Sequence, residues 1–371
     1  MEPDGSCTSE RHADPPLGVP EVIEPSWLTS VLRQSRVIDK ARVRSTVGES
    51  IGTGQVAENR RYRLDYDVDV PGAPRSLILK EASEDPTSRS TAMLMGLYRR
   101  EVLFYRLLAP RLRIRIPACY HAAIDEPSGR FILVLEDLPP TAHVDQLTGF
   151  SADHAMLALE QAAALHAPLW GSKWLGTLSW LAGQQGRTAD NVMILPKLMT
   201  EFVKRYADTA PPRVLELCER VAPGAAAFAL RQPKPWTAQH GDFRPDNMLF
   251  GARNGEVPLA VVDWQTVGLG PGMVDVAFVL GTSLDIDARR AHEVDLVRGY
   301  HQALCAGGVE GYDWDRCWRD YRRYAYYALT FLAPSAVLVK RTERGDRMFL
   351  TALDRAVAQI ADLSAEELLP S

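Results

Sequence analysis

The sequence lacks the features that mark several large classes of protein. Its 371 residues include five cysteines but no Cys-x-x-Cys pair, so neither a zinc knuckle nor a disulfide framework is indicated. Acidic residues outnumber basic ones by 47 to 42, and the basic excess of a nucleic-acid-binding protein is missing. No uninterrupted apolar run approaches the roughly 18 residues of a membrane span. We therefore expect a reducing, cytoplasmic location and no nucleic-acid or membrane partner.

We expect no secretory signal in the first twenty residues. This stretch reads MEPDGSCTSERHADPPLGVP, which is polar, acidic and proline-rich, without a basic start or an apolar stretch. Such a composition buries too little apolar surface to offset the entropy of folding. We expect a disordered tail over residues 1–22. The chain as a whole is 46% hydrophobic, which is ample for a core, and its length indicates two domains or one two-lobed unit.

The predicted secondary structure changes near residue 139. Before it come short β-type runs such as RSLILKEA and RFILVLEDL, bounded by Gly, Pro or Asp as antiparallel strands are. Only TAMLMGLYRREVLFYRLLAP has a long helical spacing there. After the double proline, helical patterns dominate, interrupted by residues 240–275. We predict an α+β protein with an antiparallel-sheet N-lobe over residues 23–138 and a mainly helical C-lobe over residues 139–371.

The stretch HGDFRPDNMLF, residues 240–250, concentrates polar chemistry before a strand-like run. Pro245 stiffens the backbone between Asp242 and Asn247, so both side chains can face one space. A second strand-like run, LAVVDWQ, ends at Asp263. Asn247 and Asp263 offer the hard oxygen atoms that Mg²⁺ prefers, which leaves Asp242 to accept a proton. The alternative is a polar turn in which Asp and Asn act as caps.

The spacing His-x-Asp-x-x-x-x-Asn, followed by an aspartate at a strand end, is that of a kinase active site. Such a site also uses a strand lysine paired with a helix glutamate, so that the lysine holds the α- and β-phosphates. Lys80 ends an apolar run, and Glu101 lies in the helical segment that follows. We expect this pair to form, with Glu101 preferred over Glu81. A solvent-exposed lysine is the alternative.

The nucleotide also needs backbone contacts. In ESIGTGQVAENRRYRL, Ser50, Gly52 and Gly54 would allow the backbone to approach phosphates closely. An ordinary glycine hairpin is the alternative. The run FILVLEDLPP ends the strand-rich part. There we expect backbone groups near Glu136 and Leu138 to bond the edge of the adenine ring.

HGDFRPDNMLF followed by AVVDWQTVGLGPGMVDVAFVL resembles the aminoglycoside phosphotransferase and choline kinase superfamily. The ecdysteroid-kinase-like (CHK-kinase-like) branch is the most similar. The resemblance implies a two-lobed protein-kinase-like fold, ATP and Mg²⁺ as cofactors, and transfer of the γ-phosphate to a hydroxyl of a small molecule, whether an antibiotic, a sterol-like compound or another metabolite. It implies that Asp242 is the catalytic base, that Asn247 and Asp263 bind Mg²⁺, and that Asp275 braces the loop. An N-cap is the alternative role for Asp275.

Arg244 departs from the family pattern, since many relatives carry His or Leu-His where this chain has Phe243-Arg244. We include Arg244 among the catalytic residues. Its guanidinium could reach the γ-phosphate or pair with Asp246 as a brace, and we favour the brace.

Two other functions compete with a small-molecule kinase. A nucleotide-binding pseudokinase or regulatory scaffold is disfavoured because every expected catalytic group is present. A protein kinase is disfavoured because helix-like sequence resumes soon after Asp263, which leaves little room for an activation loop.

The acceptor is less well indicated. Trp314, Trp318 and Tyr321 recur at helical spacing, which is typical of core but would also suit an acceptor pocket. Acidic pockets hold polycationic sugars, yet the acidic residues of this region are also typical of a solvated face; they are Asp285, Asp287, Glu293, Asp295, Asp313 and Asp315. The aromatic positions favour a less charged, partly apolar acceptor. His166, in an apolar helical pattern, is predicted to be a core histidine. No pattern indicates an oligomeric state.

Overall fold

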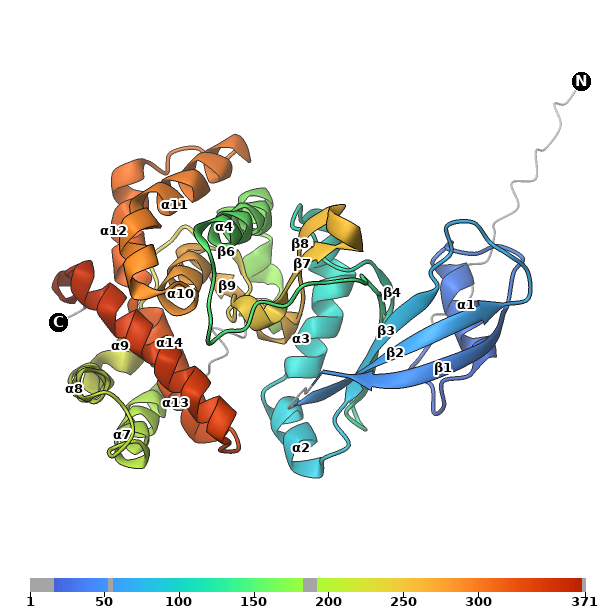
Figure 1. Ribbon diagram of the computed structural model, residues 1–371, viewed down its shortest axis with the longest axis horizontal. Helices are drawn as coiled ribbons and strands as arrows, with labels where there is room; N and C mark the ends of the chain where they lie inside the picture. Colours follow the sequence, from blue (N-terminus) through green and yellow to red (C-terminus); the bar gives the residue numbers. More distant parts are fainter. Residues whose placement is uncertain (1–16, 53–55, 183–191, 369–371) are drawn as a thin grey trace, which may run out of the picture. The chain divides into compact units, whose positions relative to one another are not determined.

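The structure is a computed structural model that describes residues 17–52, 56–182 and 192–368. The chain forms two compact units (Figure 1). The first comprises the chain up to Val102 together with Ala118–Asp137, and the second comprises Leu103–Pro117 and the chain from Leu138 onward. The segment Leu103–Pro117, which the sequence placed in the N-lobe, therefore groups with the second unit. Its backbone is bonded there, since Arg113 N–H donates to the carbonyl of Ala164.

The predicted tail is longer than the structure supports. Residues 1–16 lie outside the described residues. Residues 17–22 do not form a free tail, because Leu17 and Val19 pack against the core of the first unit. The carbonyls of Gly18 and Pro20 also accept hydrogen bonds from His121 and Arg130. Two apolar side chains in an otherwise polar stretch are enough to anchor it.

The first unit is a five-stranded antiparallel sheet, as the alternating runs predicted. The strand order is β1-β2-β3-β5-β4, and the strands are β1 (Val43–Ile51), β2 (Ala57–Tyr66), β3 (Ser76–Ala82), β4 (Cys119–Asp125) and β5 (Arg130–Glu136). Helix α1 (Pro25–Gln34) covers one face of the sheet. Its Leu28 and Leu32 are fully buried in one cluster with Leu77 and Val134, so the sheet is held by apolar burial.

The long helical segment predicted after β3 is divided in two. Helix α2 (Pro86–Leu94) ends before Gly96, and helix α3 (Leu97–Leu103) begins after it. Gly96 has φ of 67°, a left-handed conformation that breaks the helix and that glycine adopts at little cost. A turn of π-helix, Phe104–Leu108, follows α3. This path places Glu101 on α3.

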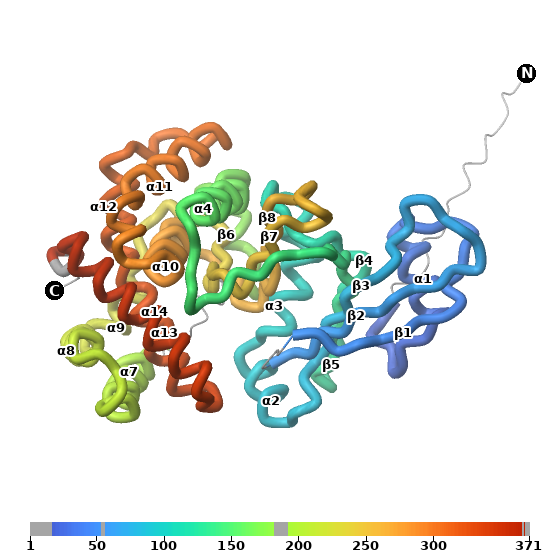
Figure 2. The backbone as a smooth tube through the Cα atoms, in the orientation of Figure 1, coloured from blue at the N-terminus to red at the C-terminus, as the bar shows by residue number. Residues whose placement is uncertain are grey.

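The second unit is mainly helical, as predicted (Figure 2). Its longer helices are α4 (Ala152–His166), α7 (Leu195–Arg205), α8 (Pro212–Val221), α9 (Ala225–Leu230), α10 (Met273–Ser283), α11 (Ile286–Ala306), α12 (Trp314–Tyr324), α13 (Tyr326–Leu338) and α14 (Glu343–Asp362). Every residue of α10 is buried, because α4, α11, α12, α13 and α14 all pack against it. Helix α10 is therefore the fixed centre of this unit. Within the described ranges, none of the helices has the length and apolar character needed to cross a membrane.

Two short two-stranded sheets account for the β-type insert predicted within the helical part. Strands β6 (Thr237–Gln239) and β9 (Gly268–Gly270) pair antiparallel, as do β7 (Met248–Ala252) and β8 (Val257–Val261). The loop between β6 and β7 contains residues 240–247, and the loop between β8 and β9 contains residues 262–267. The two small sheets thus hold both polar loops close to the N-terminal end of α10.

Candidate active site

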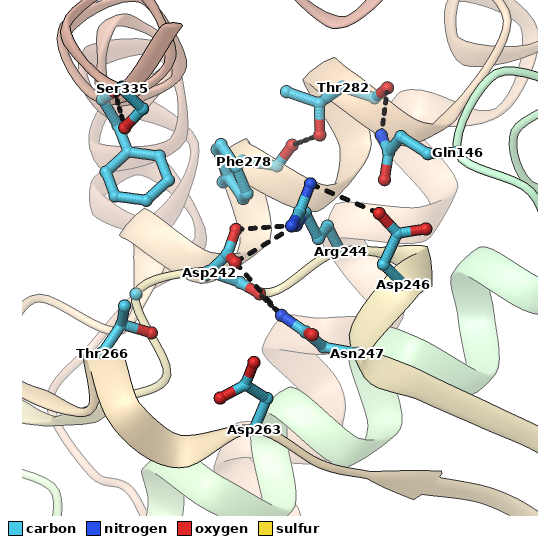
Figure 3. Close-up of polar contacts among 12 residues, drawn as sticks. Gln146, Asp242, Arg244, Asp246, Asn247, Asp263, Thr266, Phe278, Thr282 and Ser335 are labelled. Atoms are coloured by element: carbon cyan, nitrogen blue, oxygen red, sulfur yellow. Dashed lines mark hydrogen bonds and ion pairs between the residues drawn. The ribbon is translucent and has the colours of Figure 1, made fainter. Parts of the chain in front are cut away.

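The loop after β6 brings Asp242 and Asn247 together. Gly241 has φ of 82°, and a Cβ atom there would lie 2.8 Å from the carbonyl oxygen of Thr266, so only glycine fits. Pro245–Asn247 forms a single 3₁₀ turn that reverses the chain. Asn247 Nδ2 then donates to the Asp242 carbonyl at 2.8 Å and to its carboxylate Oδ2 at 3.2 Å. Figure 3 shows this contact.

His240 holds the start of the loop through both ring nitrogens. Its Nδ1 accepts the backbone N–H of Asp242 at 3.3 Å. Its Nε2 lies 3.0 Å from the carbonyl of Val262, so the ring acts as the neutral tautomer that donates from Nε2. The side chain is fully buried and therefore ties the two polar loops together without exposing charge.

Asp275, in the first turn of α10, supports the same loop from beneath. Its carboxylate is buried and accepts the backbone N–H groups of His240 at 2.7 Å and Gly241 at 2.9 Å. His166 Nε2 lies 3.1 Å from the same carboxylate, and His166 Nδ1 lies 2.9 Å from the Tyr300 hydroxyl. Asp275 makes no capping bond to its own helix, so its bonding matches the brace and not the N-cap. His166 is a hydrogen-bonded core histidine.

Asp263 lies at the end of β8 in a strained conformation. Its φ and ψ of 64° and 75° are left-handed, a region that aspartate enters more readily than most residues. The next residue, Trp264, is buried and stacks on Phe104 with centroids 3.9 Å apart. This anchored ring holds the strained turn in place. In Figure 3 the Asp263 carboxylate is turned toward Asp242 and Asn247.

Arg244 engages the candidate base itself. Its Nε lies 3.0 and 3.1 Å from the two carboxylate oxygens of Asp242, and its Nη1 lies 3.4 Å from Asp246. Burial disfavours the guanidinium charge, but Asp242, Asp246 and Asp263 outweigh that effect and raise the pKa of Arg244 above its ordinary value. Arg244 thus stays charged and pairs with Asp246, as a brace would. The additional contact with Asp242 was not anticipated.

Asn247 and Asp263 form a donor set that fits magnesium. Because the Asn247 amide nitrogen faces Asp242, the amide oxygen remains to act as a ligand beside the Asp263 carboxylate. In the described part of the chain, no group of three or more His, Cys, Asp or Glu side chains could hold a metal ion. Two protein oxygens are sufficient for Mg²⁺, which completes its shell with water and substrate phosphates.

The first unit contains the predicted Lys80–Glu101 pair. Lys80 on β3 lies 2.8 Å and 2.7 Å from the two carboxylate oxygens of Glu101 on α3. Their side chains are only 8% and 2% exposed, so both charged groups are shielded from bulk water. A buried ion pair of this geometry holds the ammonium group in a defined position.

The remaining predicted nucleotide contacts fall in two stretches of the chain, residues 50–54 and residues 136–138. Ser50 is exposed at the end of β1, and Gly52 has φ of 71° in the hairpin that follows. Gly54 lies outside the described residues. Glu136 ends β5, where its N–H and carboxylate bond the backbone of Ala118. Leu138 is buried and packs against Ala252 and Ala260 within the second unit.

Sequence patterns missed two supports of these sites. Tyr327 on α13 donates its hydroxyl to the Gly241 carbonyl at 2.7 Å, from 86 positions away. In the first unit the Asp137 carboxylate accepts from Arg61 at 2.7 Å and Ser76 at 2.6 Å, and the hydrogen bond that Arg61 donates to Asp137 raises the pKa of Arg61. Neither Tyr327 nor Asp137 lies in a motif. No local signal could have identified them.

The aromatic side chains at helical spacing on α12, Trp314, Trp318 and Tyr321, have a packing role. Tyr321 is fully buried, and it donates to the Glu293 carboxylate at 2.6 Å. Trp314 and Trp318 stack on each other, and the guanidinium of Arg298 on α11 lies 4.7 Å from the Trp314 ring. These side chains contact α11, so the core interpretation of their spacing holds.

Comparisons with known proteins agree with this geometry. Residues 52–318 match the family described as "Phosphotransferase enzyme family" (APH). Choline kinase from Cryptosporidium parvum Iowa II is similar in structure, with a TM-score of 0.56 at 9% identity over 94% of this chain and 98% of that one. Plasmodium vivax ethanolamine kinase gives 0.50 at 10% identity over 84% and 82%. A GDP complex of aminoglycoside 2′-phosphotransferase-IIIa gives 0.50 at 12% identity over 92% and 97%. These likenesses show the kinase-like fold. No curated protein matches the chain significantly.

Because the loop donates backbone hydrogen bonds to Asp275, we expect residues 240–247 to become more mobile when this carboxylate is removed. Asp275→Asn replaces one acceptor oxygen with an NH₂ group that would face a backbone N–H, so we expect unfolding to become easier by about 1–3 kcal/mol. Hydrogen exchange measured by mass spectrometry should become faster in peptides covering residues 240–247. The matched control is Asp295→Asn, at an exposed position of α11. Unchanged exchange in the Asp275 variant would contradict the brace.

Proposed function

The chain belongs to the phosphotransferase enzyme family, and we propose that it moves the γ-phosphate of ATP to a hydroxyl group of a small molecule with the help of Mg²⁺. One observation carries the proposal: Asp242, Asn247 and Asp263 lie on two loops that are held by buried hydrogen bonds. Phosphoryl transfer depends on positioning and on charge stabilisation, and these loops supply both.

Asp242 is proposed as the base. Its carboxylate orients the acceptor hydroxyl and takes its proton while the acceptor oxygen forms a bond to the γ-phosphorus. The bond from that phosphorus to the β–γ bridging oxygen breaks, and ADP leaves with the electron pair. Asn247 keeps Asp242 in place through two hydrogen bonds and presents its amide oxygen together with Asp263. A bound Mg²⁺ would neutralise charge on the phosphates.

Lys80 and the backbone groups predicted from the sequence are proposed to hold the nucleotide. Lys80, oriented by Glu101, would bind the α- and β-phosphates. Backbone groups at Ser50, Gly52 and Gly54 would approach the phosphates. The backbone at Glu136 and Leu138 would bond the adenine edge. The Arg61–Asp137–Ser76 contacts support this last site, because they fix the end of β5 next to it.

Arg244 is proposed to orient the base. Its two contacts with the Asp242 carboxylate and one with Asp246 hold the carboxylate in one rotamer. The same positive charge lowers the cost of bringing anionic phosphate close to three aspartates. The brace that the sequence favoured is thus extended from Asp246 to Asp242.

The short segment between Asp263 and α10 argues against a protein kinase. Helix α10 begins at Met273, ten positions after Asp263, so the segment where a protein kinase carries its activation loop is very short. We propose a small hydroxylated acceptor, a cytoplasmic location, and no nucleic-acid or membrane partner. We also place the chain in the ecdysteroid-kinase-like branch, which rests on the resemblance of residues 240–250 and 260–280.

Replacing the base should abolish transfer without abolishing binding. Asp242→Asn keeps the size of the side chain but cannot take the proton, so we expect kcat to fall by about 10²–10⁴-fold. ADP release with a panel of alcohols measures kcat, and ATP affinity should stay near the wild-type value. Asp295→Asn is the control, since Asp295 is exposed on α11. Full activity of the Asp242 variant would refute the mechanism.

The Mg²⁺ assignment predicts a metal-specific loss. Asp263→Asn removes the carboxylate, while asparagine tolerates the same left-handed backbone. We expect the rise in Tm produced by ATP with Mg²⁺ to shrink to the rise produced by ATP with EDTA. Thermal unfolding of both proteins under both conditions tests this. A Mg²⁺-dependent rise as large as in the wild type would show that Asp263 is not a ligand.

The buried pair can be separated into its structural and nucleotide roles. Lys80→Met removes the ammonium group that neutralises the buried Glu101 carboxylate, and we expect unfolding to become easier by about 3–5 kcal/mol. The double variant Lys80→Met with Glu101→Gln should recover most of that stability, because no charge remains buried. Its KM for ATP should nevertheless stay high. Recovery of both stability and KM in the double variant would mean that Lys80 does not contact the nucleotide.

A further inference from the structure

A buried tyrosine on α3 contacts the ends of two strands of the sheet. Tyr98 is 2% exposed, and its ring stacks on Phe131 of β5 with centroids 4.3 Å apart. Its hydroxyl accepts the backbone N–H of Ser83 at 3.3 Å and donates to the carbonyl of Val56. Val56 directly precedes β2, and Ser83 directly follows β3. The stacked ring thus fixes the hydroxyl between these two strand ends.

The register of β2 and β3 sets Val56 and Ser83 opposite each other. The two strands pair antiparallel without a register shift, and the last pair of the ladder is Ala57 with Ala82. One step further along the same register, the next pair would be Val56 with Ser83. The two backbone groups that bond Tyr98 therefore belong to one position of the ladder.

This position is one at which the ladder would form hydrogen bonds. Hydrogen-bonded pairs alternate with non-bonded pairs along an antiparallel ladder. At the other end of the same two strands, the Leu64 N–H donates to the Arg75 carbonyl at 2.9 Å. Counted from there in steps of two, Val56 and Ser83 form a hydrogen-bonded pair. The Tyr98 hydroxyl thus lies where the Ser83 N–H would donate directly to the Val56 carbonyl.

The inserted hydroxyl holds the strand ends apart next to groups with proposed nucleotide roles. Two hydrogen bonds in series in place of one add roughly 2 Å between the backbone donor and acceptor. Val56 lies four positions after Gly52, and Lys80 lies three positions before Ser83. The separation at this end of the ladder therefore determines how far the backbone after Gly52 lies from the strand that carries Lys80.

Helix α3 supports both of these groups. Tyr98 and Glu101 are three positions apart on α3, so their side chains lie on one face of the helix. Glu101 holds the ammonium group of Lys80, while Tyr98 holds the strand end at Val56. Because one short helix carries both contacts, it fixes the ammonium group relative to the start of β2.

We propose that Tyr98 is a positioning residue for binding of the nucleotide phosphates. Its hydroxyl keeps the ends of β2 and β3 apart, so that backbone groups preceding Val56 and the ammonium group of Lys80 bind the same phosphate chain. The inference rests on the proposed phosphotransfer function and adds to its nucleotide site a residue that lies in no motif. Tyr98 acts through Val56 and Ser83 and does not itself contact the nucleotide.

Removing the hydroxyl tests the inference. Tyr98→Phe keeps the ring that stacks on Phe131 but loses both hydrogen bonds of the hydroxyl. We expect the Kd for ATP with Mg²⁺ to rise about tenfold, and the Kd for adenosine, which has no phosphate, to stay within about twofold. Isothermal titration calorimetry measures both constants. In the assay of ADP release, KM for ATP should rise with a smaller change in kcat.

Tyr66→Phe is the matched control. Tyr66 is buried at the other end of β2, where its hydroxyl donates to the Pro74 carbonyl at 2.9 Å. Both variants remove a buried tyrosine hydroxyl from the same sheet, so both should lower Tm. Only Tyr98→Phe should weaken ATP binding. It should also speed hydrogen exchange in a peptide covering residues 81–86, because the Ser83 N–H loses its acceptor.

The outcomes separate the inference from the function on which it rests. The inference is overturned if Tyr98→Phe leaves the affinity for ATP unchanged, or weakens ATP and adenosine equally. An equal loss of ATP affinity in Tyr66→Phe also overturns it, since the effect would then be a general loosening of the sheet. These results leave the phosphotransferase intact. If the wild-type protein neither binds ATP with Mg²⁺ nor releases ADP with any acceptor, the proposed function fails, and the inference fails with it.

Discussion

The candidate site depends on one buried carboxylate. A loop without regular secondary structure leaves its backbone N–H groups without ladder partners, and buried amides need them. Asp275 accepts two of these groups, from His240 and Gly241, and α10 holds Asp275 because that helix is buried along its whole length. The position of Asp242 thus follows from the packing of a helix that makes no contribution to the chemistry itself.

The charged side chains of the candidate site are also held by their partners. Lys80 and Glu101 are both buried, and each is tolerated because the other neutralises it. In the second unit, Asp242 and Asp246 share the single positive charge of Arg244, which neutralises them in part. Polar groups that are fully paired hold one geometry, and fixed geometry is what phosphoryl transfer requires of a protein.

Much of the fold and part of the site could be predicted from the sequence. The antiparallel sheet follows from alternating runs between turn residues, and the Lys80–Glu101 pair follows from a strand end and a helix at kinase spacing. The predicted tail was too long because composition averages over residues, whereas Leu17 and Val19 act individually. The segment Leu103–Pro117 was assigned to the wrong unit because its partners, such as Ala164, lie far along the chain.

By itself, the sequence determined the chemistry that short stretches of backbone impose. Asp242 and Asn247 meet because Gly241 and Pro245 leave the loop few other paths, and that spacing can be read directly. Only the tertiary structure decided what surrounds the loop. The Tyr327 bond to Gly241 and the Gln146 bond to Thr282 join residues 86 and 136 positions apart. Such contacts depend on how helices pack, and local patterns of polarity do not encode packing. For that reason the loop indicates the reaction, and the packing of the helices decides how the loop is held.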